Sequence, residues 1–307
     1  MNKVIDPIYD IGFKLLFGRE HVSEPLLISL LNTIFTGDPQ LSNIVEVKYE
    51  NAEKPDEIEE GKGIRYDVHC TTSTGHHFIV EMQKSEQTHF LERSGYYVSR
   101  ATAVQGYKGD SYESGIWDFS LTPVVGVFLC NFHVRGLPKK PLTKLRLTDE
   151  ETGEPIGDFH RYAFIQLPFF IKEKVECTDM MDQWIYNIKN MGSRQNVAFT
   201  TQNEIFSYLE SVSNVAALNK KERDIYEASL MRARDYNAVM KTAEAKAEAK
   251  GMAEGMAKGM AEGMAKGAEL EKVEMIRNMY RHGLSIDVIA AVTNFPIQKI
   301  EEIISHN

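Results

Sequence analysis

One segment restricts the fold more than any other: Pro123 to Phe132 is a nearly continuous apolar run of strand length. A strand with apolar side chains on both sides of the pleat is typical of a sheet that is covered on both faces. The stretch from Glu86 to about Lys108 has helical spacing, and we expect it to form a helix that covers this sheet. The sequence therefore predicts layers of helices and strands.

The same kind of pattern predicts the other elements. Breaks at Gly18 and Gly37 delimit two expected helices within the stretch from Tyr9 to Phe35. Residues 44 to 51 alternate like a strand, and an acidic loop from Ala52 to Gly63 follows. Later in the chain, and in the same domain, we expect strands at Leu142–Leu147 and Arg161–Leu167 and helices at Asp179–Met191 and Glu204–Tyr236.

Two strands, Arg65 to Thr72 and His76 to Gln83, are expected to pair as an antiparallel hairpin. Ser73, Thr74 and Gly75 lie between them, and glycine suits the left-handed position of a three-residue hairpin loop. A loop of fixed length also fixes which residues face each other across the two strands.

The predicted register brings two carboxylates together. A loop that pairs Thr72 with His76 also pairs Asp67 with Glu81, because each step outward moves one residue along both strands. Gln83 shares the face of Glu81, whereas the alternating residues Phe78, Val80 and Met82 point into the core. Adjacent carboxylates repel each other unless a cation or a proton lies between them. Two oxygen ligands with room for water and phosphate are typical of a Mg²⁺ site.

These residues and their flanking segments resemble a known superfamily. In PD-(D/E)XK nucleases, an Asp at the start of one strand and Glu-x-Lys on the next form the active site. Asp67 and Glu81-Met82-Gln83 fit this arrangement, with Gln83 in place of the lysine. The chain resembles more closely the Rpn group of recombination-promoting nucleases, also called PD-(D/E)XK nuclease family transposases, whose members carry Glu-x-Gln at this position.

The resemblance covers roughly residues 5 to 240 and extends to the repeat and helical tail. Its supporting segments are Asp10-Ile-Gly-Phe13-Lys14-Leu-Leu-Phe17-Gly18, Tyr66-Asp67-Val68, Val80-Glu81-Met82-Gln83, Arg93-Ser-Gly-Tyr96-Tyr97 and Gln105-Gly106-Tyr107. The resemblance implies a restriction-endonuclease-like α/β fold, which is a mixed sheet flanked by helices and here followed by an α-helical C-terminal tail.

The resemblance also implies a site. Asp67, Glu81 and Gln83 would be catalytic, and Asp67, Glu81 and the Met82 backbone carbonyl would coordinate Mg²⁺, or Mn²⁺ in its place. Gln83 can donate a hydrogen bond to water or phosphate, but it brings no positive charge to a transition state that accumulates negative charge. Lys14, Arg93 and Lys84 are candidates to supply that charge, and Lys14 and Arg93 match positions of the family motifs.

Five residues are expected to assist the site as auxiliary residues: Asp10, Lys14, Arg93, Tyr97 and Gln105. Each also has an ordinary structural interpretation. Asp10 and Lys14 have helical spacing and could form only a surface ion pair. The other three could simply pack the covering helix.

Composition limits the partners. The formal net charge of −9, from 35 basic and 44 acidic residues, argues against nonspecific coating of nucleic acid, so any contact with DNA must be local. Cys70, Cys130 and Cys177 are widely spaced and odd in number, and we expect buried thiols. The start lacks a secretory signal, and there is no apolar run of about 18 residues, so we expect a cytoplasmic protein without a membrane segment.

The composition changes near Thr242, and glycine recurs at every fourth residue from Gly251 to Gly267. Each Glu–Lys pair at i,i+4 favours a helix by about 0.2–0.5 kcal/mol, whereas each interior glycine costs about 0.8–1 kcal/mol relative to alanine. We therefore expect residues 241–268 to form a helical spacer that frays. It would join a nuclease-like domain at residues 1–240 to a small helical tail at residues 269–307.

Three short helices are expected in the tail, where Gly283 ends the first, Ser285 caps the second and Pro296 precedes the third. A helix-turn-helix DNA reader has this order of elements. The expected recognition helix, however, carries one Lys against two Glu between Ile297 and Glu302, which is a poor match to phosphate. Self-association or regulation is the favoured role, with DNA contact as the alternative.

The sequence leaves three functions open. The leading prediction is a bacterial-type, Mg²⁺-dependent DNA endonuclease that promotes recombination or serves mobile-element or defence biology, as the family resemblance implies. The second is a catalytically idle DNA- or protein-binding module that keeps the nuclease fold. The third is an interaction protein that forms a homo-oligomer through its tail.

Overall fold

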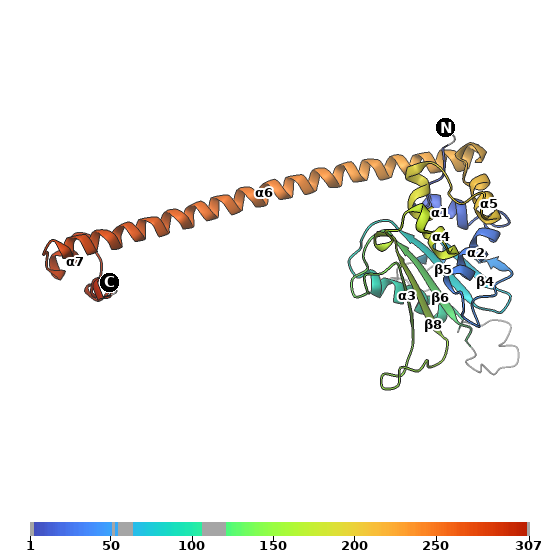
Figure 1. The fold of residues 1–307 in the computed structure, drawn as a ribbon, viewed down its shortest axis with the longest axis horizontal. Coiled ribbons are helices and arrows are strands. Elements are labelled where there is room, and N and C mark those ends of the chain that lie inside the picture. Colours follow the sequence, from blue (N-terminus) through green and yellow to red (C-terminus); the bar gives the residue numbers. More distant parts are fainter. Residues whose placement is uncertain (1–2, 51–52, 55–63, 106–120, 306–307) are drawn as a thin grey trace. The chain divides into compact units, whose positions relative to one another are not determined.

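A six-stranded mixed sheet organises the first compact unit of the computed structural model, residues 1–231 (Figure 1). In spatial order its strands are β1 (Val47–Tyr49), β4 (Val68–Thr72), β5 (His77–Gln83), β6 (Val124–Cys130), β8 (His160–Gln166) and β7 (Leu142–Arg146). Strands β5, β6 and β8 run parallel, and the others run antiparallel to their neighbours. Two very short strands, β2 (Glu53–Lys54) and β3 (Ile64–Arg65), form a separate antiparallel pair.

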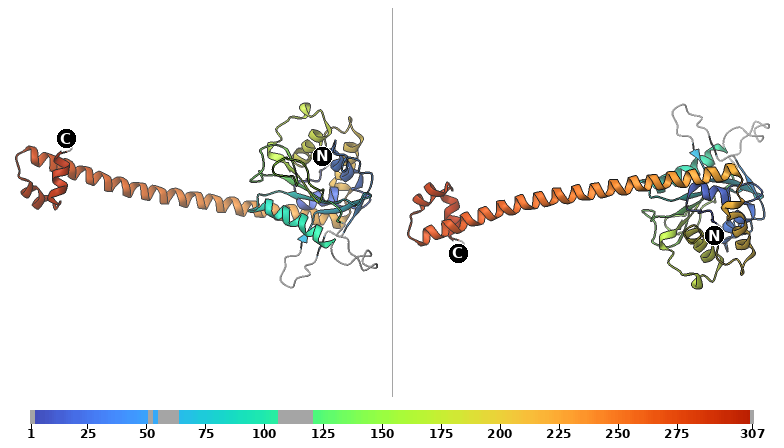
Figure 2. Two further views of the ribbon diagram at one scale, coloured as in Figure 1. Left: turned by 90° about the horizontal axis from the view of Figure 1, so that it is seen from below. Right: turned by 90° about the horizontal axis from the view of Figure 1, so that it is seen from above.

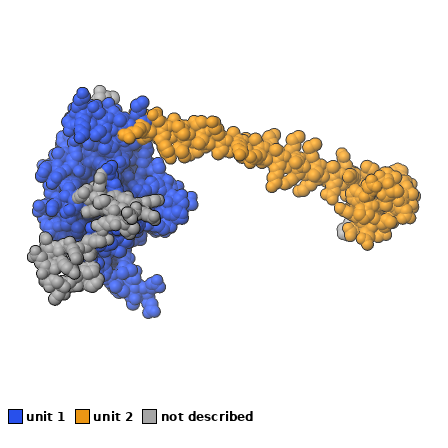
Figure 3. All heavy atoms as spheres, turned by 180° about the vertical axis from the view of Figure 1, so that it is seen from behind, with its two compact units in different colours: residues 1–231 blue, residues 232–307 orange. Residues whose placement is uncertain are grey.

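The structure describes residues 3–50, 53–54, 64–105 and 121–305. Most of the acidic loop predicted at residues 52–63 lies outside these ranges, as do Gly106, Tyr107 and the predicted helix end at Lys108. The chain divides into two compact units, residues 1–231 and residues 232–307 (Figure 3). The division into three parts, with boundaries near residues 240 and 268, stays a prediction.

Helices cover both faces of the sheet (Figures 1 and 2). On one face lie α1 (Asp10–Phe17), α2 (Glu24–Ile34), α4 (Met180–Arg194) and α5 (Glu204–Ser213), and on the other lies α3 (Phe90–Val104). Strand β6 is buried along its whole length. Its Val127 belongs to the core cluster of Phe17 and Trp184, whereas its Phe128 belongs to that of Val98 in α3. The prediction of a strand buried on both faces is confirmed.

The hairpin has the predicted register. The Thr72 N–H donates to the His76 carbonyl at 3.0 Å, and Val68 faces Val80 across the ladder. Gly75 has a φ of 85°, in the left-handed region that glycine adopts without strain. The loop geometry inferred from the sequence is therefore confirmed.

The helix predicted from Glu204 to Tyr236 is wrong in one respect, because the chain breaks it. Helix α5 ends at Ser213, and α6 begins only at Lys220. Asparagine side chains produce the break: Asn214 Oδ1 accepts from the Ala216 N–H at 3.0 Å, and Asn219 Oδ1 accepts from the Glu222 N–H at 2.9 Å. Such side chains compete with the helical backbone for hydrogen bonds and favour helix starts.

Short elements complete the unit. Within the described residues, three 3₁₀ turns occur at Leu167–Phe169, Lys174–Glu176 and Val215–Ala217. The strand predicted at residues 44–51 is shorter than expected, since only Val47–Tyr49 pair with β4. The predicted strands at 142–147 and 161–167 are confirmed as β7 and β8, which pair antiparallel in the same sheet. All three cysteines are free and buried, as expected.

Helix α6 (Lys220–Arg281) contains the glycine repeat. A Cβ placed on any glycine from Gly251 to Gly267 would meet nothing within 4 Å. The helix there is supported by local pairs such as Lys250 and Glu254, whose Nζ and Oε1 lie 3.8 Å apart. The predicted helix is confirmed, and its fraying stays a prediction. None of the described helices has the length and apolar character needed to cross a bilayer.

The end of α6 packs with α7 (Ile286–Thr293) and α8 (Ile297–Ser305) through three buried isoleucines, Ile276, Ile289 and Ile300. Gly283, with a φ of 89°, follows the end of α6 as predicted. The first tail helix is not short, however, because α6 runs into it without a break. Ser285 is the N-cap residue of α7, but its side chain makes no capping hydrogen bond. Self-association through the tail stays a prediction.

Gly12 lets α1 approach the N-terminal segment closely, since a Cβ there would lie 2.0 Å from the Asp6 carbonyl oxygen. We expect Gly12→Ala to lower the free energy of unfolding by about 1–3 kcal/mol, because this clash outweighs the gain in helix propensity. Gly95→Ala is the matched control. That helical position has nothing within 4 Å of an added Cβ, so the change should stabilise by about 0.5–1 kcal/mol. Urea denaturation measures both, and equal signs would contradict the packing argument.

Candidate active site

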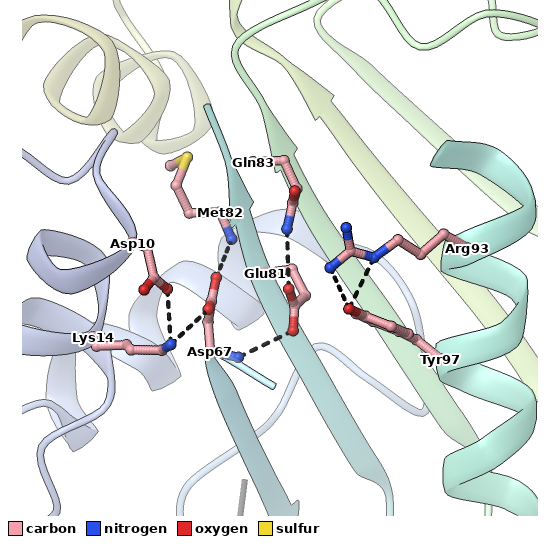
Figure 4. A network of polar contacts seen from close by, with 8 residues as sticks. All are labelled: Asp10, Lys14, Asp67, Glu81, Met82, Gln83, Arg93 and Tyr97. Atoms are coloured by element: carbon pink, nitrogen blue, oxygen red, sulfur yellow. Dashed lines mark hydrogen bonds and ion pairs between the residues drawn. The ribbon is translucent and has the colours of Figure 1, made fainter. Parts of the chain in front are cut away.

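Polar side chains from four elements meet beside the carboxyl end of β5 (Figure 4). Asp67 immediately precedes β4, and Glu81 and Gln83 lie near the C-terminal end of β5. The flanking helices contribute the remaining side chains: Asp10 and Lys14 from α1, and Arg93 and Tyr97 from α3. The helices on the two faces of the sheet thus bring polar side chains to the carboxyl end of this inner strand.

Asp67 and Glu81 face each other, as the hairpin register predicted. The Asp67 N–H donates to Glu81 Oε1 at 3.0 Å, and the Met82 N–H donates to Asp67 Oδ2 at 2.8 Å. The Asp67 side chain is 8% exposed, and Glu81 is 2% exposed. These reciprocal bonds fix both carboxylates against the backbone of the opposite strand.

The chain bends at Asp67, which simple alternation did not predict. Tyr66 and Val68 would share a face in a regular strand, yet Tyr66 packs with the α3 cluster and Val68 packs with the α1 cluster. The bend turns the Asp67 carboxylate toward α1, while Glu81 stays between it and Tyr97 (Figure 4). Asp67 therefore reaches a side chain of α1 as well as the hairpin.

Lys14 links two carboxylates. Its Nζ lies 2.8 Å from Asp10 Oδ1 and 3.1 Å from Asp67 Oδ1. The Lys14 side chain is 27% exposed, whereas that of Asp10 is 62% exposed. The surface ion pair considered from the sequence is present, but it continues inward to the buried Asp67.

Burial and mutual repulsion raise the pKa of the carboxyl pair. Burial raises the pKa of Asp67, and the negative charge of Glu81 raises it further. Burial likewise raises the pKa of Glu81, although the Asp67 N–H and the Arg93 charge act in the opposite direction. Burial favours the neutral form of Lys14, but Asp67 and Asp10 outweigh it and raise the pKa of this ammonium. The two carboxyls thus resist ionising together unless a further cation is bound.

Gln83 and Arg93 complete the wall on the α3 side. The Gln83 side-chain amide donates to Glu81 Oε2 at 3.1 Å. Arg93 donates to the Tyr97 hydroxyl through Nε at 2.9 Å, and its Nη1 donates to Gln87. These bonds hold the guanidinium close enough that its charge opposes part of the rise in the pKa of Glu81. Arg93 and Tyr97 therefore make polar contacts at the site in addition to packing α3.

The site opens into a pocket of about 390 Å³. Its lining includes three carboxylates, Asp10, Asp67 and Glu81, and four cationic side chains, Lys14, Arg65, Lys84 and Arg93. Lys84 stacks over Tyr9, with its Nζ 3.7 Å from the ring centroid. A pocket that combines acidic and basic side chains is suited to an anion that is bound together with a metal ion.

Comparison with known proteins identifies the family of this chain. The model of the PD-(D/E)XK nuclease family transposases matches residues 7–243, which include every site residue described above. The chain belongs to this family. No curated protein and no solved structure matches it. The recognition made from the motifs is confirmed, and the mixed sheet flanked by helices agrees with the fold of PD-(D/E)XK nucleases.

The donor set of this PD-(D/E)XK site fits a hard divalent cation. Asp67 and Glu81 supply two buried carboxylates. The Met82 N–H points to Asp67, and since the N–H and C=O of one strand residue point to the same side, its carbonyl is directed toward the site. No three His, Cys, Asp or Glu side chains gather in metal-binding geometry within the described ranges. A Mg²⁺ ion commonly binds through one or two carboxylates and keeps several waters, so two suffice.

One expected auxiliary residue lies elsewhere. Gln105 follows the C-terminal end of α3, where its side-chain amide donates to the Thr122 carbonyl at 3.0 Å and its carbonyl accepts from the Thr122 N–H at 2.8 Å. Arg93 and Gln105 are separated by about 18 Å along a helix that rises 1.5 Å per residue. The structure thus places Gln105 at the amino end of β6, where it ties α3 to that strand, and outside the pocket.

Three pocket residues, Arg65, Ser85 and Gln87, were not predicted from the sequence. Arg65 precedes the Tyr66-Asp67 motif and Gln87 follows Gln83 by four positions, so their closeness in sequence was the available signal. Their side-chain directions depend on the bend at Asp67 and on the chain between β5 and α3. Neither has a repeating pattern from which a direction could be inferred.

The raised pKa of Glu81 makes a prediction about stability without metal. A carboxyl whose pKa is higher in the folded state stabilises the fold below its unfolded pKa, and this contribution is lost as pH rises through the folded value. The melting temperature of the wild type in EDTA should therefore fall more steeply than that of Glu81→Gln between about pH 5 and about pH 8. Circular dichroism melts measure this. Parallel curves for the two proteins would show that Glu81 carries no such penalty.

Proposed function

We propose that this family member is a metal-dependent DNA endonuclease that hydrolyses phosphodiester bonds with Mg²⁺, or Mn²⁺ in its place. One observation carries the proposal: Asp67 and Glu81 lie buried against each other in a pocket whose lining also includes four cationic side chains. Burying two adjacent carboxylates destabilises a protein unless a cation is bound between them. Such an arrangement is typical of a site that functions with a metal ion.

Asp67, Glu81 and the Met82 carbonyl would hold the ion. A divalent ion bound there would polarise the phosphate and lower the pKa of its bound water. The chain's own residues have separate tasks in this proposal. Gln83 keeps Glu81 oriented through its amide, and Arg93, held by Tyr97 and Gln87, stabilises negative charge on the phosphate.

DNA is the proposed substrate because of the family, and the charges permit it. The net charge of −9 argues against broad attraction to nucleic acid, so the phosphate must be attracted locally, by cationic side chains of the pocket such as Arg65, Lys84 and Arg93. We further propose that the protein acts in the cytoplasm, in recombination, mobile-element transfer or defence. These are the processes that the family name and the motif resemblance suggest.

Nicking of supercoiled plasmid tests the activity. Purified wild type should convert supercoiled DNA to open circles in Mg²⁺, and EDTA should abolish this. Asp67→Ala and Glu81→Ala should each reduce the rate by at least about 10²-fold, because each removes a ligand on which charge stabilisation depends. Gln105→Ala, whose residue lies outside the pocket, is the matched control and should cut at a rate close to wild type. Equal cutting by all four proteins would point to a contaminating nuclease.

A catalytically idle binding module is the rival function, and one observation favours it. Gln83 directs its amide to Glu81 and supplies no cation where related nucleases carry lysine. Calorimetry separates the two functions. We expect the wild type to bind Mn²⁺ and Asp67→Asn to bind it at least about tenfold more weakly, because the variant loses one of two charged ligands. If wild type and variant show the same weak or absent binding, the idle module is the better description.

A further inference from the structure

We infer that Lys14 occupies the position of a second metal ion. The Asp10–Asp67 pair is then a cation site that the ammonium of Lys14 fills, and the centre binds a single divalent ion. This inference rests on the proposed function, since it concerns the metal content of the same site. It assigns Lys14 a role that differs from simple attraction of DNA. It also assigns Asp10, the most exposed carboxylate of the site, the role of positioning that ammonium.

The geometry at Lys14 is that of a bridging cation. One nitrogen lies 2.8 Å from Asp10 Oδ1 and 3.1 Å from Asp67 Oδ1. In two-metal nucleases, ions about 3.5–4 Å apart share a carboxylate. Asp67 is such a shared carboxylate here, with Oδ1 toward Lys14 and Oδ2 toward the Met82 N–H, on the side of Glu81 (Figure 4).

The backbone under Lys14 is fixed. Phe13 and Leu16 of α1 are fully buried in the core, and Gly12 lies tightly against the Asp6 carbonyl. The spacing from Asp10 to Lys14 is one helical turn, so both side chains project from the same face of a firmly packed helix. The ammonium is thus held by the fold and by two carboxylates, in contrast to a lysine that only extends from the surface.

Charge balance indicates one ion. Asp10, Asp67 and Glu81 carry three negative charges when ionised, and Lys14 carries one positive charge, which leaves a net charge of −2. A single divalent ion neutralises this centre, and Arg65, Lys84 and Arg93 remain for the phosphate. The centre without Lys14 would carry three negative charges, more than one divalent ion neutralises. Removal of the ammonium should therefore open a second site between Asp10 and Asp67.

Metal stoichiometry tests the inference in the full-length protein. Titration calorimetry with MnCl₂ should give one ion per wild-type chain and two per chain for Lys14→Ala. Lys14→Arg keeps a cation and should bind one. Lys84→Ala is the matched control, because it removes a pocket cation that stacks on Tyr9 and should also leave one ion per chain. Electron paramagnetic resonance should show an isolated Mn²⁺ signal in wild type and a spin-coupled pair in Lys14→Ala.

Each outcome has one meaning. Two ions in the wild type, or one ion in a folded Lys14→Ala, would overturn the inference and leave the proposed nuclease intact. No carboxylate-dependent ion in the wild type would overturn the proposed function itself. If circular dichroism shows that Lys14→Ala does not fold, the wild-type stoichiometry and the Mn²⁺ signal still decide between one ion and two.

Discussion

The site depends on a reciprocal pair of hydrogen bonds between two strands. The Asp67 N–H donates to the Glu81 side chain, and the Met82 N–H donates to the Asp67 side chain. A carboxylate that accepts a backbone N–H is oriented more firmly than one that faces water. Together the two bonds hold both acidic groups beside the end of β5.

The helices on the two faces of the sheet bring different cations to this centre. Helix α1, packed on the sheet through Phe13 and Phe17, brings a cation to Asp67, whereas α3 brings a guanidinium near Glu81. Each carboxylate therefore has its own basic neighbour, and the two basic residues come from opposite faces of the sheet. In the proposed nuclease, positive charge would reach the centre from the helices, because Gln83 of the strand supplies none.

The proposed metal function and the stability of the fold would conflict at this site. Two buried carboxyls with raised pKa values favour protonation in the apo protein, and a metal site requires both to be ionised. The stability of the surrounding core offsets this loss of stability, because the strand that contains Glu81 pairs along its length with the fully buried β6. Active sites commonly retain such local destabilisation because the stable alternative, a neutral apolar cluster, could not bind the ion.

The sequence by itself determined what depends on neighbours along the chain. Loop length and Gly75 set the hairpin register, and with it the pairing of Asp67 with Glu81, because strand residues advance in fixed steps. A continuous apolar run located β6, periodicity located most of the helices, and the motifs identified the family. The break between α5 and α6 also depends on residues close in sequence, namely the capping asparagines.

Only the tertiary structure decided which distant side chains reach the hairpin. The bend at Asp67, the approach of Lys14 from α1 and the distance of Gln105 from the pocket have no periodic signal. They follow from how helices seat on a twisted sheet, where each position depends on many packed residues at once. Short-range patterns thus specified the two carboxylates, whereas long-range packing selected the cations around them.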